Sequence, residues 1–106
     1  MASDRLYGML GLAMRAGRVT IGTEQVCLAM PKGHVKLVLV SEGASAPTKK
    51  KVLTKSEFYG ITAITVDIDT AELGRLLGKT HTPACIAITD ENFAKQIKLL
   101  ADLTDD

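Results

Sequence analysis

A continuous apolar run that leads directly into a turn and a lysine-rich segment is the feature that most constrains the fold of this chain. Residues 37–40 read Leu-Val-Leu-Val, which is typical of a strand buried on both faces of a sheet rather than of a one-sided hairpin strand. Gly43 and Ala44 then turn the chain, and Ser45 is a suitable N-cap for a helix that carries Pro47 in its first turn.

Three consecutive lysines, Lys49 to Lys51, fall in the early turns of that predicted helix. Exposed cations near a helix N-terminus oppose the helix dipole by about 0.3 to 1 kcal/mol each, so the stability of the helix does not account for them. Two interpretations remain open. The lysines either form a site for phosphate or make up a solvated face that aids solubility.

The rest of the chain alternates helical and strand patterns, without a linker or an internal repeat. Asp69 with Glu72 resembles a capping pair, and Asp90 is a second predicted cap. The predicted helices cover 6–14, 23–30, 47–59, 69–78 and 91–100, and the predicted strands cover 19–21, 36–42, 61–68 and 84–89. This order predicts one domain over residues 1–106, an α/β fold in which a three-layer α/β/α sandwich surrounds a small central mixed sheet.

Cysteine usage and hydropathy narrow the class of protein. Cys27 and Cys85 lie in apolar segments without CxxC spacing, and only His34 and His81 could join them as metal ligands. We therefore expect both cysteines to be core residues in a reducing compartment, and we expect no metal site. No apolar segment approaches the roughly 20 residues of a membrane span, so the prediction is a cytoplasmic protein without a membrane partner.

Motifs that carry catalytic chemistry are not found in the sequence. It has no GxGxxG, no P-loop and no HExxH, and no serine or cysteine stands in a recognisable nucleophile motif. Asp67 and Asp69 flank Ile68 and would lie on one face of a strand, as paired catalytic carboxylates could. Because they stand at a strand end that leads into a helix, they are interpreted as a solvated neighbour and a cap. The sequence thus predicts a protein that is not an enzyme and that takes no cofactor and no small-molecule substrate.

The net charge of +1 hides an asymmetry between the two halves of the chain. Residues 1–55 hold nine Lys or Arg against three acidic residues, whereas residues 56–106 hold four against nine. If the basic half gathers on one face, it forms an electrostatic footprint for a polyanion. If the basic residues are scattered, the asymmetry has no such meaning.

Several short motifs follow one another in an order that resembles a known family. In chain order they are Ile21 to Val26, Lys32-Gly33, Lys36 to Glu42, Leu73-Gly74, Gly78 and Ala84 to Ile88. Together they resemble the ribosomal protein family of archaeal L-seven-Ae and eukaryotic L-thirty-e. Leu10 to Ala13, and Glu42 to Ser45 followed by Thr48 to Val52, are most like the small bacterial YlxQ-type members. The family fold is a three-layer α/β/α sandwich.

The resemblance implies a non-enzymatic, ribosomal-protein-like function in which structured, kink-turn-like RNA is bound. The start of the second helix and the loop before the last strand are the implied contacts. We expect Gly22 to Gln25, Lys36, Lys79 and His81 to lie along one edge of the sandwich. The implied RNA-binding residues are Gly22, Thr23, Glu24, Gln25, Lys36, Lys79, His81 and Thr82. The implied partner is structured RNA, ribosomal RNA included, bound by a monomer. On the alternative interpretation Thr23 only caps a helix and His81 is a surface residue.

Two residues of the second helix depart from the family pattern, one at its start and one farther along. Glu24 stands where the family has Asn or Lys, and Leu28 stands where many members have a lysine. A carboxylate opposes phosphate, and leucine cannot donate to it. These departures favour an alternative function, a protein-interaction module that has kept the fold and lost kink-turn binding.

Overall fold

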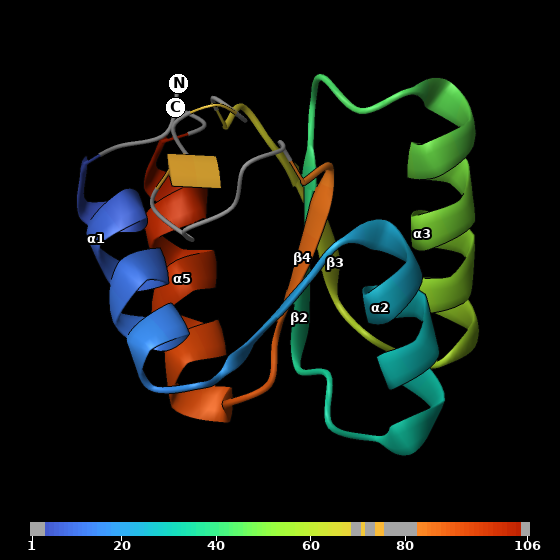
Figure 1. Ribbon diagram of the computed structural model, residues 1–106, viewed down its shortest axis with the longest axis horizontal. Helices are drawn as coiled ribbons and strands as arrows, with labels where there is room; N and C mark the ends of the chain where they lie inside the picture. The colour runs from blue at the N-terminus through green and yellow to red at the C-terminus, as the bar shows by residue number, and fades with distance from the viewer. Residues whose placement is uncertain (1–3, 69–70, 72–73, 76–82, 105–106) are drawn as a thin grey trace.

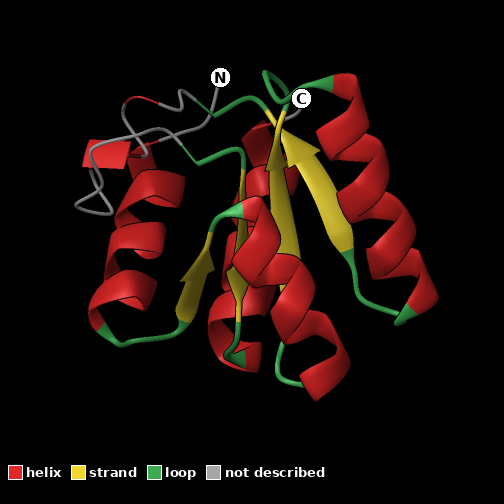
Figure 2. Cartoon of the chain, turned by 45° about the vertical axis from the view of Figure 1, so that its right-hand side comes forward, coloured by secondary structure: helices red, strands yellow, loops and turns green. Residues whose placement is uncertain are grey.

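The fold is a four-stranded mixed sheet with helices on both faces, seen in a computed structural model that describes residues 4–68, 71, 74–75 and 83–104. The strands are β1 (Val19–Ile21), β2 (Leu37–Ser41), β3 (Ala63–Val66) and β4 (Cys85–Ile88). The helices are α1 (Asp4–Arg15), α2 (Thr23–Ala29), the 3₁₀ helix η1 (Met30–Lys32), α3 (Ala46–Phe58) and α5 (Glu91–Thr104). Helices α1 and α5 cover one face, and α2 and α3 cover the other (Figures 1 and 2). The predicted three-layer α/β/α sandwich is therefore confirmed.

The strands are ordered β1-β4-β2-β3 across the sheet. Strand β4 runs antiparallel to both of its neighbours, whereas β2 and β3 are parallel. All five residues of β2 are buried, as the apolar run at 37–40 predicts for a strand covered on both faces. The predicted strand at 61–68 covers only 63–66 in the structure. It starts later because the Ile61 amide donates to the Ser56 carbonyl at the end of α3.

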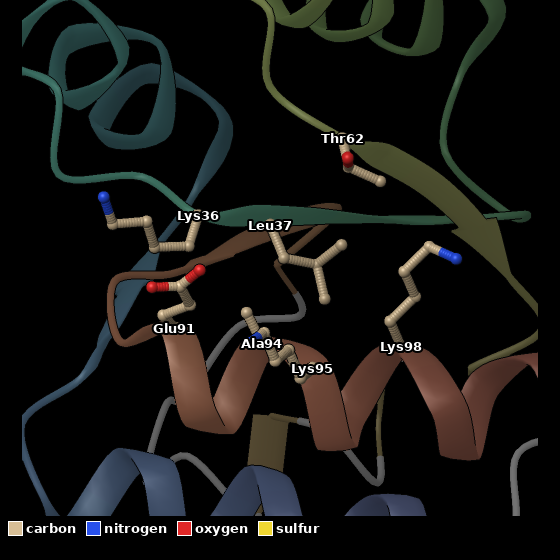
Figure 3. Close-up of a pocket in the computed structure, with 7 residues that line it drawn as sticks. All are labelled: Lys36, Leu37, Thr62, Glu91, Ala94, Lys95 and Lys98. Atoms are coloured by element: carbon tan, nitrogen blue, oxygen red, sulfur yellow. The ribbon is translucent and has the colours of Figure 1, made fainter.

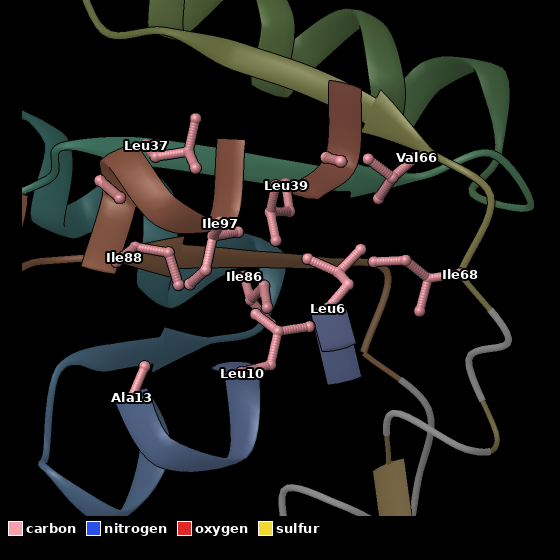
Figure 4. Packing of buried hydrophobic residues seen from close by; sticks show 12 residues of the cluster. Leu6, Leu10, Ala13, Leu37, Leu39, Val66, Ile68, Ile86, Ile88 and Ile97 are labelled. Carbon is pink, nitrogen blue, oxygen red and sulfur yellow. The ribbon is translucent and has the colours of Figure 1, made fainter. Parts of the chain in front are cut away.

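Successive residues of the strands point to opposite faces, so the sheet separates two hydrophobic clusters. Figure 4 shows the cluster under α1 and α5, where Leu37, Leu39, Ile86 and Ile88 meet Leu6, Leu10 and Ile97. The second cluster, under α2 and α3, contains Val26, Val38, Val40, Val52, Ala87 and the two cysteines, Cys27 and Cys85. Both cysteines are free and buried, so the prediction that they are core residues is confirmed.

Local caps set several helix boundaries where the sequence predicts them. The Ser45 hydroxyl accepts from the Thr48 amide at 3.3 Å, and the Asp90 carboxylate accepts from the Phe93 amide at 3.0 Å. Pro31 converts the end of the second helix to the 3₁₀ helix η1, which Gly33 closes with φ 80°. The helix predicted at 69–78 lies largely outside the described residues. Within this range the structure describes Ala71, Gly74 and Arg75, and these are helical. No helix in the described ranges is long and apolar enough to span a membrane.

Candidate functional site

One end of the sheet brings together segments that are far apart in the sequence. The Gly22 amide donates to the Cys85 carbonyl at 3.0 Å, and the Ser41 amide donates to the Ala84 carbonyl at 2.9 Å. The ends of β1 and β2 therefore flank the start of β4 on either side. We call this end of the sheet, made by Gly22, Ser41 to Ser45 and Pro83 to Cys85, the Cys85 edge. Helices α2 and α3 both begin there.

The start of α2 has no side-chain cap. Gly22 occupies the N-cap position with φ 97° and ψ 144°, a conformation that L-residues rarely adopt, and it has no side chain to accept a hydrogen bond. The first ladder bond of the helix runs from the Val26 amide to the Gly22 carbonyl at 2.9 Å. Thr23 is thus the first residue of the helix and not its cap. Amides of the first turn are available to an external acceptor at this position.

Glu24 and Gln25 are exposed in the first turn of α2, and Thr23 is half-buried. Leu28 lies one turn beyond Glu24, on the same side of the helix, and its side chain is 56% exposed. Both departures from the family pattern are consequently on the surface. Neither Glu24 nor Leu28 is needed to fill the core.

The lysine-rich segment also starts at the Cys85 edge. The Ser41 hydroxyl accepts from the Gly43 amide at 3.2 Å, which shapes the turn between β2 and α3. Lys50 and Lys51 are exposed in the first two turns of α3, and Lys49 is half-buried. Helices α2 and α3 contact each other on one face of the sheet (Figure 2). Their positive N-terminal ends therefore share one end of the domain, an arrangement that sequence patterns alone did not reveal.

Lys36 is at the other end of the sheet. Its amide donates to the Ile88 carbonyl at 2.8 Å, whereas Gly22 bonds to Cys85 at the opposite end of β4. Three residue steps along a strand separate these positions by roughly 10 Å. The expectation that Lys36 shares an edge with Gly22 is wrong, because β2 enters the sheet at one end and leaves it at the other. The exposed Lys36 instead lines a cleft beside α5 (Figure 3).

Lys79, His81 and Thr82 lie outside the described residues. The described chain resumes at Pro83, which is buried, and enters β4 beside Gly22. Pro83 and Ala84, which lead into the last strand, thus lie at the Cys85 edge. The contact of these three residues with RNA stays a prediction.

Basic residues of the N-terminal half are distributed over both faces of the sandwich. Arg5 and Arg15 are exposed on α1, whereas Lys50 and Lys51 are exposed on α3, across the sheet. The charge asymmetry of the sequence therefore does not become one continuous basic face. The basic groups lie in separate places on the surface.

The buried thiols lie in the layer between the sheet and α2. Burial, followed by the influence of Cys27, raises the pKa of Cys85 from 9.0 to about 12. A thiol with such a pKa is protonated at neutral pH and is a poor nucleophile. Within the described residues, no group of three or more His, Cys, Asp or Glu is placed to hold a metal ion.

Comparisons with known proteins identify a family and several relatives of this chain. A family profile described as "Ribosomal protein L7Ae/L30e/S12e/Gadd45 family" matches residues 4–98. The chain is 36% identical over 102 residues to "RNA-binding protein YlxQ" of Bacillus subtilis, a match that covers 96% of this chain and 100% of the relative. It is 32% identical over 94 residues to "Large ribosomal subunit protein eL30" of Tetrahymena thermophila, a match that covers 85% of this chain and 86% of the relative.

Two solved structures share the fold. A protein of unknown function from Bacillus halodurans C superposes with a TM-score of 0.86 at 37% sequence identity, over 94% of this chain and 99% of that chain. The Giardia lamblia 15.5kD RNA binding protein superposes with a TM-score of 0.75 over 97% of this chain and 92% of that chain. At 14% sequence identity, the second likeness concerns the fold alone.

Proposed function

Because the chain belongs to the ribosomal protein L7Ae/L30e/S12e/Gadd45 family, we propose that it is a non-enzymatic RNA-binding protein that recognises structured, kink-turn-like RNA at the Cys85 edge. The names of the YlxQ relatives support the RNA partner. The observation that carries the location is the Gly22–Cys85 hydrogen bond, which holds the start of α2 beside the chain leading into β4. The proposed contacts are Gly22 to Gln25 and the loop residues Lys79, His81 and Thr82.

The chemistry of the edge suits a bent RNA better than a regular duplex. Uncapped amides at a helix start attract phosphate, and the Thr23 hydroxyl and the Gln25 amide can exchange hydrogen bonds with base edges. Proteins recognise RNA mostly by shape and by bases that are splayed out of the helix, so a few polar side chains at a fixed position suffice. Lys50 and Lys51 on α3 add long-range attraction from the same end of the domain.

Paired RNAs and a double substitution test this proposal. Binding to a kink-turn RNA and to a straight duplex of the same length is measured by titration, for the wild-type protein and for Thr23→Ala/Gln25→Ala. We expect the kink-turn to bind more tightly, and the double variant to lose about tenfold in affinity for it, the effect of hydrogen bonds worth about 1.4 kcal/mol. Gln96→Ala, an exposed glutamine on α5, is the matched control and should change nothing. Equal affinity for bent and straight RNA would contradict kink-turn recognition.

A protein-interaction module is the second candidate, and the surface of the α2 and α3 layer favours it. Leu28 is 56% exposed and Phe58 is 80% exposed, although neither is needed in the core. Large exposed apolar groups of this kind are common in protein interfaces. The two functions differ in their response to salt: the logarithm of RNA affinity falls linearly with the logarithm of the salt concentration, whereas an apolar interface does not lose affinity in this way. Failure of the wild-type protein to bind either RNA at low salt would favour the interaction module.

A further inference from the structure

A cleft lies between α5 and the ends of β2 and β3 that are opposite the Cys85 edge. Its volume is about 210 Å³. It is lined by Lys36, Leu37, Thr62, Glu91, Ala94, Lys95 and Lys98 (Figure 3). We call it the α5 cleft. Lys36 bonds to Ile88 at one end of β4, and Gly22 bonds to Cys85 at the other end. The length of β4 therefore separates the cleft from the start of α2.

Three lysines surround an apolar floor in the α5 cleft. Leu37 is 1% exposed and Ala94 is 7% exposed, and Figure 3 shows both between Lys36 at one end and Lys98 at the other. Lys95 comes from the middle of the cleft, three residues before Lys98 on the same side of α5. The cations are therefore spread along the cleft and do not converge on one point.

The charges of these lysines are only partly balanced within the protein. Lys98 pairs with Asp102 at 3.3 Å, an exposed contact of little energetic value. The side chains of Lys36 and Lys95 form no ion pair with any described residue. Glu91 is the one carboxylate among the described residues of the lining, and it lies close to the Lys36 end (Figure 3). An extended polyanion would neutralise the lysine charge that is not paired with a carboxylate of the described residues.

We propose that the α5 cleft is a second RNA contact, at which the phosphates of one strand lie along α5. One phosphate is neutralised by each of the three lysines, Lys36, Lys95 and Lys98. The Thr62 hydroxyl donates to the RNA backbone from the side of the sheet. Lysines spaced along a cleft match successive phosphates better than a single small anion. This inference rests on the proposed function, and it adds a contact on another face of a domain whose extents are 31 × 30 × 28 Å. An RNA must therefore be bent, or have an arm long enough to reach around the domain, to use both contacts.

The salt dependence of RNA binding tests this inference. The slope of log affinity against log salt is measured for the kink-turn RNA with the wild-type protein and with Lys95→Gln/Lys98→Gln. We expect the magnitude of this negative slope to decrease by about two units, one for each lysine. The control is Lys32→Gln/Lys55→Gln, which removes the same charge from η1 and α3 and should leave the slope unchanged. Glu91→Gln should act in the opposite direction and tighten binding at low salt, because it removes a negative charge from the cleft.

A shortened RNA separates the two contacts. Trimming one arm of the kink-turn at a time should yield an RNA for which the wild-type protein and Lys95→Gln/Lys98→Gln have the same slope, because the strand no longer reaches α5. If the wild-type protein binds but both double variants lower the slope equally, the α5 cleft is overturned while the proposed function stands. If the wild-type protein binds no structured RNA, the proposed function itself fails. If a polyglutamate peptide of equal charge competes as well as RNA does, the cleft is an acidic-protein site and the RNA contact is refuted.

Discussion

The Gly22 amide lies 3.0 Å from the Cys85 carbonyl, and this hydrogen bond joins the end of β1 to the start of β4. Because Cys85 is in the core, the bond fixes the position of the α2 start relative to the sheet. The geometry depends on the backbone of Gly22, whose φ of 97° is accessible mainly to glycine. A substitution at this residue therefore acts on the candidate interface through the backbone.

Gly22→Ala should destabilise the protein by about 1 to 3 kcal/mol, the usual cost of a strained backbone conformation. Free energies of unfolding from urea titration measure the effect. Gly8→Ala is the control: Gly8 is exposed within α1, and an added Cβ meets nothing within 4 Å there. That change should stabilise the protein by roughly 0.5 to 1 kcal/mol through helix propensity. A stability of Gly22→Ala equal to or higher than that of the wild type would count against strain at Gly22.

Glu24→Lys should tighten binding to a standard kink-turn several-fold at low salt, because it replaces a charge that repels phosphate by one that attracts it. The same change should lower stability by about 0.3 to 1 kcal/mol, since a carboxylate in the first turn favours the helix dipole. Fluorescence titration and thermal unfolding measure the two effects.

Leu28→Lys gives a second, independent test at the same surface. The exposure of Leu28 means that a lysine is expected to be accommodated without loss of packing. We expect a gain in RNA affinity that becomes smaller as salt is raised, with an unchanged unfolding midpoint. A kink-turn affinity that stays flat in both variants would show that this side of α2 does not face the RNA.

Ser56→Ala should stabilise the protein by about 1 kcal/mol. Ser56 is 1% exposed, and its hydroxyl oxygen is the single buried side-chain N or O atom in the described part of the chain that lacks a hydrogen-bond partner. An unpaired buried polar atom costs free energy that alanine does not incur. Thr54→Ala, at an exposed position of the same helix, isolates the gain from helix propensity alone. A gain no larger than that of Thr54→Ala would show that the hydroxyl is satisfied in solution.

The pKa of Cys85, raised from 9.0 to about 12, predicts a loss of stability in alkali. Below pH 9 the thiol is protonated in both the folded and the unfolded state. As the pH rises from about 9 to about 12, only the unfolded state loses the proton, so the free energy of unfolding decreases. Unfolding titrations across this range should show a shallower decrease in Cys85→Ala than in the wild type. Parallel slopes in the two proteins would exclude Cys85 as the source.

Features set by neighbouring residues could be predicted from the sequence, whereas features set by strand order could not. The caps at Ser45 and Asp90 use hydrogen bonds to amides three residues ahead, and the burial of β2 follows from its own apolar run. The position of Lys36 depends on which strands are neighbours and on their directions, which no local pattern encodes. The i, i+3 spacing of Lys95 and Lys98 in the last helix is a weak sequence sign of a basic helix face. It did not reveal that Lys36 would lie opposite.

The division of the core by the sheet has a consequence for how such a domain diversifies. Among the described residues, the cluster beneath α1 and α5 has no member in common with the cluster beneath α2 and α3. Substitutions in separate packing units, without common partners, have nearly additive effects on stability. Mutations that adapt the α2 surface to a new ligand therefore lower the free energy of unfolding through one cluster. Stabilising mutations that compensate for them can arise in the other cluster. Ligand preference and thermostability can thus evolve in separate halves of the same small protein.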